Sequence, residues 1–295
     1  MIDLCNPAEL KALLARHGFH FSKAKGQNFL IQDWVPRQIV AQAGVDRSCG
    51  VLEIGPGVGP LTQQLCLTAG KVVAIELDRS LAPILSETLG EFENLELLWG
   101  DALKMDLGAL VRERFAGLRP MACANLPYYI TTPVLAALLE ARCFRSITVM
   151  VQKEVAQRIA APAGSPAYGA FSVFCQYYAR PALLFDVPPS CFLPQPRVTS
   201  AVLHLAVREA LPWDIPDEAL FFRVVRASFA QRRKTLQNGL ASGFPQLSKG
   251  EIAQALEDCG LSPTVRGETL DIPAFAAVAR ALGAAAAQKK EQKNV

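Results

Sequence analysis

The chain lacks the features that mark membrane, secreted and zinc-binding proteins. No apolar run reaches the roughly 18 residues needed to cross a membrane. The first residues include Asp3 and Glu9 and do not have the pattern of a signal peptide. The eight cysteines form no Cys-x-x-Cys pair and have no neighbouring histidines at zinc spacing. We therefore expect a cytoplasmic protein with no membrane contact, no structural metal and no disulfides.

The charge balance is also weak. Lys and Arg number 30 and Asp and Glu 27, and a formal charge of +3 is too small to indicate a polyanionic partner. What the chain does have is apolar surface to bury, because 51% of its 295 residues are hydrophobic. This length and composition favour a globular protein with one large domain and a smaller one.

Continuous apolar runs alternate with helical patterns between Gly50 and about Val151. Runs of this kind are typical of strands buried on both faces, so the fold class predicted is α/β, a doubly wound parallel sheet. The predicted strands are 51–54, 72–75, 95–99, 121–124 and 147–151, with helices at 61–69, 81–89, 107–115 and 133–141 and a late antiparallel strand at 201–207.

Pro212 and Pro216 mark a change of composition, and the residues after them have helical patterns. A capping box at Ser248 to Glu251 predicts a helix start there. We therefore predict a doubly wound domain over residues 1–210, including an N-terminal helical segment, and a small all-helical domain over 211–283. The charged, low-complexity tail 284–295 is expected to be disordered.

Three strand ends carry residues suited to binding a nucleoside. The turn Glu53-Ile54-Gly55-Pro56-Gly57-Val58-Gly59 follows the first strand, but a dinucleotide fingerprint started at Gly55 would need glycine where Pro60 stands, which disfavours NAD. Glu76 ends the second strand, about 20 residues on, where a carboxylate meets ribose hydroxyls. Asp101 ends the third and is placed to accept from an adenine amine. A single glycine turn of this kind usually has no ligand, and a single acid at a strand end is more often a helix cap. The prediction therefore depends on finding the turn and both acids at three successive strand ends.

This set resembles the motifs of class I methyltransferases, in which an E-x-G-x-G-x-G turn precedes two acids. The resemblance implies that Gly55, Glu76 and Asp101 bind S-adenosylmethionine as methyl donor, with no metal. Upstream, the segment 26–30 (Gly-Gln-Asn-Phe-Leu) resembles the motif with which ribosomal RNA adenine dimethyltransferases cover the methionine end of the cofactor. By that similarity Asn28 and Leu30 join the site. Without the downstream motifs, a simple turn with a buried phenylalanine would be the better interpretation.

The fourth strand ends in Asn125-Leu126-Pro127-Tyr128, which suits methylation of an adenine N6 amine. That amine is a poor nucleophile until acceptors draw it toward a tetrahedral geometry. The Asn125 oxygen and the carbonyl of Leu126 or Pro127 can accept its two hydrogens, while the Asn125 amide touches the cofactor. Pro127 keeps the loop rigid, and Tyr128 offers an aromatic face to the extruded base. Leucine rather than proline at the second position disfavours DNA adenine or protein glutamine methylation.

Two further stretches resemble the rRNA dimethyltransferases. Residues 187–200 match their V-P-P-x-x-F-x-P-x-P-x-V-x-S stretch, which implies that Phe192 faces Tyr128 across the adenine, although a buried loop anchor is the other interpretation. Residues 229–236 match F-x-x-R-R-K-T-L. Five cations predict contact with RNA phosphates rather than a merely solvated helix face: Arg223, Arg226, Arg232, Arg233 and Lys234.

The resemblance runs from Gly26 to about Leu282 and identifies the chain as a member of the small-subunit rRNA adenine-N6,N6 dimethyltransferase family. It implies dimethylation of two adjacent adenosines in a hairpin near the 3′ end of 16S rRNA, within an assembling 30S particle, by a monomer. A resistance-type large-subunit rRNA methyltransferase is the alternative, although it typically has Ile in place of Leu126 and a different C-terminal domain. A factor whose chief task is to bind nucleic acid is a third possibility, and intact site residues do not exclude that second role.

Overall fold

The computed structural model describes residues 2–21, 26–231 and 233–293. Contact clustering divides the chain into two compact units, one formed by Met1–Ala156 and Ala179–Glu209 and the other by Gln157–Tyr178 and Ala210–Val295. Residues 157–178 therefore belong to the second unit, whereas we had predicted them in the first domain.

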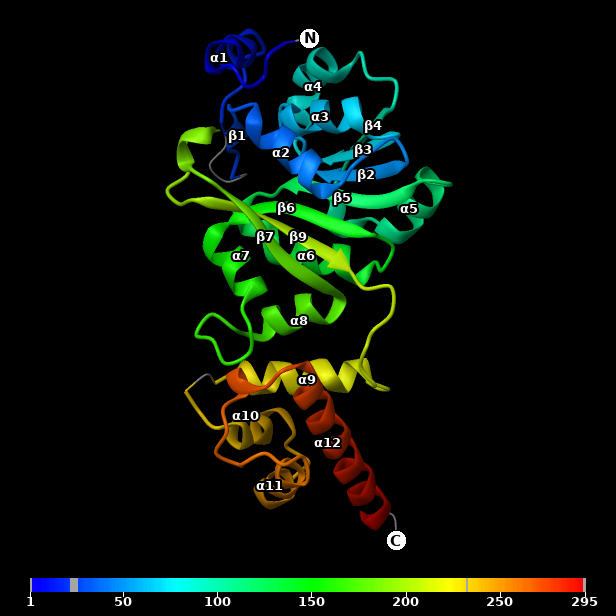
Figure 1. Cartoon of the computed structure of the whole chain (residues 1–295), viewed down its shortest axis with the longest axis vertical. Coiled ribbons are helices and arrows are strands. Elements are labelled where there is room, and N and C mark those ends of the chain that lie inside the picture. Colours follow the sequence, from blue (N-terminus) through cyan, green and yellow to red (C-terminus); the bar gives the residue numbers. More distant parts are fainter. Residues whose placement is uncertain (1, 22–25, 232, 294–295) are drawn as a thin grey trace. The chain divides into compact units, whose positions relative to one another are not determined.

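The first unit is built on a seven-stranded sheet with the order β4-β3-β2-β5-β6-β9-β7 (Figure 1). The five strands from β4 to β6 are parallel. At one edge β9 pairs antiparallel with β6, and β7 pairs antiparallel with β9, so β9 alone runs against the other six strands of this sheet. Their bounds are β2 Cys49–Ile54, β3 Lys71–Glu76, β4 Leu95–Trp99, β5 Arg119–Asn125, β6 Ser146–Gln152, β7 Ala179–Val187 and β9 Ser200–Val207. The doubly wound parallel sheet and its late antiparallel strand are confirmed.

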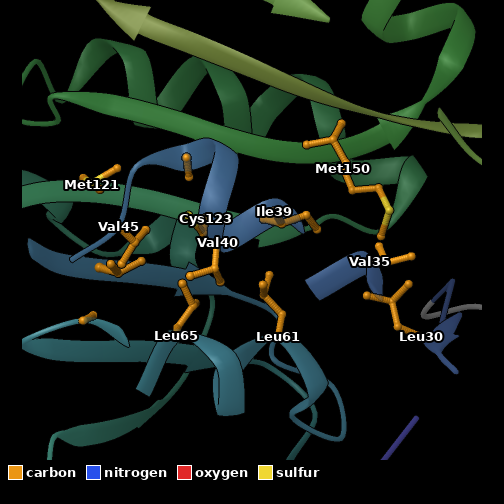
Figure 2. Close-up of a cluster of buried hydrophobic side chains, with 14 of the residues drawn as sticks. Leu30, Val35, Ile39, Val40, Val45, Leu61, Leu65, Met121, Cys123 and Met150 are labelled. Carbon is orange, nitrogen blue, oxygen red and sulfur yellow. The ribbon is translucent and has the colours of Figure 1, made fainter. Parts of the chain in front are cut away.

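Helices α2 (Trp34–Ala43) and α3 (Pro60–Thr68) pack on one face of this sheet. Figure 2 shows Ile39 and Val40 of α2 and Leu61 and Leu65 of α3 pointing toward the strands. They belong to a buried cluster that also contains Met121 and Cys123 of β5 and Met150 of β6. The apolar runs of the sequence thus become strands that are covered on their faces by helices, as parallel sheets require.

A second cluster joins α1 (Pro7–Arg16) to α4 (Ala82–Leu89) and to Phe29. Phe29 lies in the two-residue strand β1 (Phe29–Leu30), which pairs with β8 (Phe192–Leu193). The remaining elements that begin in this unit are η2 Arg79–Leu81, η3 Ala102–Lys104, α5 Leu107–Arg114, η4 Tyr128–Ile130, α6 Thr131–Glu140, α7 Lys153–Ala160 and η5 Pro189–Cys191.

The second unit is helical, with α8 Ala170–Tyr178, α9 Glu218–Phe229, α10 Leu236–Gly243, α11 Lys249–Asp258, η6 Gly267–Thr269 and α12 Ile272–Lys293. Residues 157–178 join it because the aromatic rings of α8 pack on those of α9: the Tyr177 centroid lies 5.3 Å from Phe221 and 5.0 Å from Phe222. The predicted capping box of Ser248 and Glu251 is present at the start of α11.

Helix α12 continues through residues 284–293, where we had expected disorder. Alanine occupies positions 284–287 and has the highest helix propensity of all residues, so the helix continues through this low-complexity stretch. The Lys289 ammonium also pairs with the Glu251 carboxylate of α11 at 2.7 Å. Within the described ranges, no helix is long and apolar enough to cross a membrane.

Candidate active site

A cavity of about 310 Å³ opens at the carboxyl ends of β2, β3, β4 and β5. This is the edge at which doubly wound sheets bind ligands, and the volume lies in the usual range of small-molecule sites. The structure brings nine predicted site residues to its lining: Asn28, Leu30, Gly55, Glu76, Asp101, Asn125, Leu126, Pro127 and Tyr128. No lysine or arginine is among the described lining residues.

The glycine turn after β2 lines this cavity. Gly57 has φ +62°, and a Cβ there would lie 3.1 Å from the Phe29 ring, so both the backbone conformation and the space favour glycine. The Gly57 amide donates to Glu76 Oε2 at 3.3 Å. The turn is thereby joined to the end of β3.

Glu76 is only 7% exposed, and burial raises the pKa of its carboxyl although backbone amides of Asp78 and Gly57 oppose the shift. The Asp78 amide donates to Glu76 Oε1 at 2.7 Å. The Asp78 carboxylate in turn accepts from Gln27 Nε2 at 2.8 Å. The segment 26–30 is thus attached to the end of β3, beside the cavity.

Asp101 was predicted as a cofactor ligand, with a helix cap as the other interpretation, and the structure is compatible with both. Its Oδ1 accepts from the Leu103 amide at 3.0 Å and caps η3. Its Oδ2 lies 3.7 Å from the exposed Lys104 ammonium. The same side chain lines the cavity, so it is a helix cap placed at the predicted site.

The loop after β5 is held by contacts on both sides. Asn125 Nδ2 donates to the Asn28 carbonyl at 3.3 Å, a bond between segments 97 residues apart. The Leu126 amide donates to Met150 O at 3.2 Å, and the Pro127 carbonyl accepts from Ile130 N at 3.1 Å. Among the described residues, none donates to the carbonyl of Leu126.

Tyr128 is half-buried, and its hydroxyl shares a hydrogen bond of 2.7 Å with the buried Ser200 Oγ of β9. Burial raises the pKa of this phenol, and the Ser200 bond partly opposes the shift. The hydroxyl end of the ring is therefore anchored to the sheet.

Four of the lining residues that were not predicted to bind are notable for their exposure or burial. Leu77 follows Glu76 and is 61% exposed, Leu103 lies two residues after Asp101 and is 42% exposed, and Tyr129 is 57% exposed. Exposed apolar side chains beside predicted polar ligands indicate additional ligand contacts once a structure is known. The amino-acid sequence alone does not show which apolar side chains are exposed. The fourth, Glu53 on β2, is 1% exposed, and none of the described residues donates a hydrogen bond to its Oε2.

The position of Phe192 differs from the prediction. Its side chain is 1% exposed, lies in the core cluster with Leu30 and Cys191, and is not part of the cavity lining. Pairing of β8 with β1 sets Phe192 opposite Leu30 and turns the ring into the core. In this structure the residue is the buried loop anchor, and the second aromatic wall is not formed.

The predicted RNA-binding cations differ in their surroundings. The Arg223 guanidinium is exposed, donates twice to the Gly243 carbonyl, at 3.1 and 2.7 Å, and lies 4.4 Å from the centroid of Phe244, so it keeps its charge and also joins α9 to α10. Arg226, Arg233 and Lys234 are exposed. Arg232 lies outside the described residues.

Comparison with known proteins decides the family. The ribosomal RNA adenine dimethylase family matches residues 18–272. The chain belongs to this family. Ribosomal RNA small subunit methyltransferase A of Geobacillus thermodenitrificans is 47% identical over 284 residues, covering 95% of this chain and 97% of that protein. The protein of the same name from Shouchella clausii is 48% identical, covering 95% and 96%.

Solved structures agree with this family assignment. A dimethyladenosine transferase from Plasmodium falciparum superposes with a TM-score of 0.70 at 26% identity, covering 84% of this chain and 95% of that chain. The 23S rRNA methyltransferase ErmE superposes with a TM-score of 0.65 at 23% identity, covering 87% of this chain, and shows the shared fold. The family consists of methyltransferases that depend on S-adenosylmethionine.

Proposed function

We propose that this protein transfers methyl groups from S-adenosylmethionine to the N6 amines of two adjacent adenosines near the 3′ end of small-subunit (16S) rRNA. The substrate would be an assembling 30S particle. The observation that carries the proposal is the setting of Asn125: its Nδ2 donates to the Asn28 carbonyl, which leaves Oδ1 as an acceptor at the cavity. The relatives named for small-subunit methylation cover nearly the whole chain.

The cavity fits S-adenosylmethionine by the chemistry of its lining. Carboxylates at Glu76 and Asp101 suit the hydroxyls of a ribose and the amine of an adenine, whereas no described lining residue offers a cation for a phosphate. The exposed leucines Leu77 and Leu103 can cover the faces of the adenine ring. Asn28 and Leu30 would meet the methionine end, where the bound group supplies a methyl on a positively charged sulfur.

The residues after β5 would orient the target amine. Asn125 Oδ1 and the Leu126 carbonyl are two acceptors without a donor among the described residues, whereas the Pro127 carbonyl already accepts from Ile130 and Thr131. Leu126, not Pro127, is therefore the backbone acceptor we propose. When both acceptors hold the two amine hydrogens, the nitrogen lone pair is directed away from the ring plane and toward the methyl.

Tyr128 would stack on the extruded adenine. Its hydroxyl is held by Ser200, so the ring has little freedom to lose when a base binds it. As the bond between N6 and the methyl forms, the bond between that methyl and the cofactor sulfur would break, and the methylated amine would lose one proton to water. N6 then keeps a single hydrogen, and one of the two acceptors must release its contact.

In the second unit, Arg226, Arg233 and Lys234 would contact rRNA phosphates. Such contacts position an RNA and carry little sequence information. The exposed cations would then strengthen and position the bound RNA, and the choice of adenosine would depend on the cavity.

The proposal can be tested with purified protein, labelled S-adenosylmethionine and undermethylated 30S subunits. We expect dimethyladenosine in 16S rRNA. Label that appears only in large-subunit rRNA, or only in DNA, would contradict the proposed substrate.

Asn125→Ala tests the mechanism. The variant should lose transfer while it still binds 30S subunits, because the substitution removes an acceptor from the cavity and leaves the cations of the second unit intact. Asn238→Ala, a truncation of the same amide on α10, is the matched control and should keep transfer. Normal turnover by the Asn125 variant would remove the basis of the mechanism.

A further inference from the structure

The loop after β5 carries two adjacent tyrosines with different surroundings. Tyr128 is half-buried and its hydroxyl is bonded to Ser200 Oγ at 2.7 Å. Tyr129 is 57% exposed, although its ring also lines the cavity. Burying a tyrosine ring contributes roughly 1.5 to 3 kcal/mol, so an exposed ring at the mouth of a cavity forgoes stabilisation that a partner could supply.

The Tyr129 ring is held in place although it is exposed. It lies against the backbone of Gly26, where an added Cβ would be 3.2 Å from Tyr129 Cδ1. The short helix η4 (Tyr128–Ile130) carries it, and the Ile130 amide closes that turn on the Pro127 carbonyl at 3.1 Å. The ring therefore has Gly26 on one side and a closed backbone turn beneath it.

The position of Tyr129 in the cavity separates it from the other exposed apolar residues there. Leu77 and Leu103 follow β3 and β4, beside the carboxylates of Glu76 and Asp101 that suit the cofactor. Tyr129 follows β5, four residues after Asn125. Tyr129 therefore belongs to the loop that would hold the target amine.

We propose that Tyr129 stacks on the nucleotide next to the adenosine that enters the cavity. The inference rests on the proposed function. Extruding one base leaves a face of its neighbour without a stacking partner, which is a main cost of base flipping. An aromatic ring at the mouth replaces that partner, and stacking tolerates any base because each has a π-face.

Two adjacent targets make such a platform useful in both rounds. The RNA strand has a direction, so a ring fixed on one side of the cavity would meet the neighbour on that same side in both rounds. In one round that neighbour is the other target adenosine, and in the other round it is the nucleotide beyond the pair. Because stacking tolerates any base, the same ring would lower the cost of extrusion in both rounds. Tyr129 would be a positioning residue, since it touches the flanking nucleotide and not the reacting amine.

The test compares Tyr129→Ala and Tyr129→Phe with wild type on undermethylated 30S subunits. Loss of a stacked base should raise the KM for the particle about tenfold, with kcat within about twofold. Tyr129→Phe keeps the ring and should match wild type. Affinity for S-adenosylmethionine, measured by calorimetry without RNA, should be unchanged in both variants.

Two reconstituted subunits, each with an abasic nucleotide at a different one of the two target positions, identify the partner. On the particle whose abasic nucleotide is on the side of Tyr129, wild type and Tyr129→Ala should methylate the remaining adenosine with equal KM, whereas the difference should persist on the other particle. A difference that persists on both abasic particles would overturn the inference. So would a wild-type KM in Tyr129→Ala, or a tenfold loss of cofactor affinity in place of a raised KM.

These outcomes are distinct from failure of the proposed function. A wild-type protein that leaves 30S subunits unmethylated would overturn the proposed function and this inference together. Active wild type with an equally active Tyr129→Ala variant would overturn only the role of Tyr129.

Discussion

Replacing Glu53 by glutamine should change how stability depends on pH. The Glu53 side chain is 1% exposed, on the core face of β2 beneath α3. Burial raises the pKa of its carboxyl to about 8, and the charge of Glu76 makes a smaller contribution in the same direction. Around it, the thiols of Cys66 and Cys123 also have raised pKa values, because they are buried and lie near this carboxyl.

The sign of the effect follows from the two pKa values. The unfolded chain releases the Glu53 proton near pH 4.5, whereas the folded chain keeps it until about pH 8. The stabilisation is therefore complete below pH 4.5 and is lost as the pH rises toward 8. At about 1.4 kcal/mol for each pH unit, the free energy of unfolding should fall by roughly 2 to 3 kcal/mol between pH 5 and pH 7 because of this group.

Glu53→Gln is neutral in both states and should lack that loss. Relative to wild type, we expect the variant to gain about 2 to 3 kcal/mol between pH 5 and pH 7, or roughly 5 to 10 °C in Tm. Scanning calorimetry at pH 5, 6 and 7 measures the difference, with the exposed Glu91→Gln as the matched control. Parallel curves for wild type and Glu53→Gln, even with a constant offset, would refute a neutral carboxyl at this position.

Three other variants separate roles within the molecule. Reversing Arg226 and Arg233 to glutamate should weaken 30S binding by at least tenfold and reduce its salt dependence, while affinity for S-adenosylmethionine by calorimetry stays the same. Arg223→Ala should instead destabilise the second unit by about 1 to 3 kcal/mol in urea unfolding, since the Gly243 carbonyl loses two charge-assisted hydrogen bonds. Glu76→Gln should weaken cofactor binding about tenfold by calorimetry, because an anionic acceptor becomes a neutral amide that also donates.

The parallel sheet could be predicted because its signal is local. Buried strands need continuous apolar residues, and the order of glycine turn, Glu76, Asp101 and Asn125 along the chain follows from strand ends that share one edge. Strand β7 was missed because it lies at the edge of the sheet, where most of its residues are partly or fully exposed and Pro181 interrupts the pattern.

The environment of individual side chains could not be predicted, since it depends on partners far away in sequence. A phenylalanine at position 192 is compatible both with stacking on a base and with burial in the core. The pairing of β8 with β1, which joins segments far apart in sequence, places it in the core. Arg223 fitted a cationic stripe by its spacing, yet its partner is a backbone carbonyl 20 residues later. Periodicity predicts which face of a helix a residue occupies. It does not predict whether a charged side chain on that face also makes hydrogen bonds within the protein.

The bond between Asn125 and the Asn28 carbonyl joins two functions that the sequence presents separately. The segment 26–30 carries the predicted cofactor contacts, and it is also the acceptor that sets the direction of the Asn125 amide. An amide turned by 180° would present NH₂ to the target amine, and two donors cannot pair. In the proposed mechanism, orientation of the amine therefore depends on the same segment that is predicted to cover the cofactor, so we expect a shift of that segment to impair methyl transfer even with every side chain of the β5 loop intact.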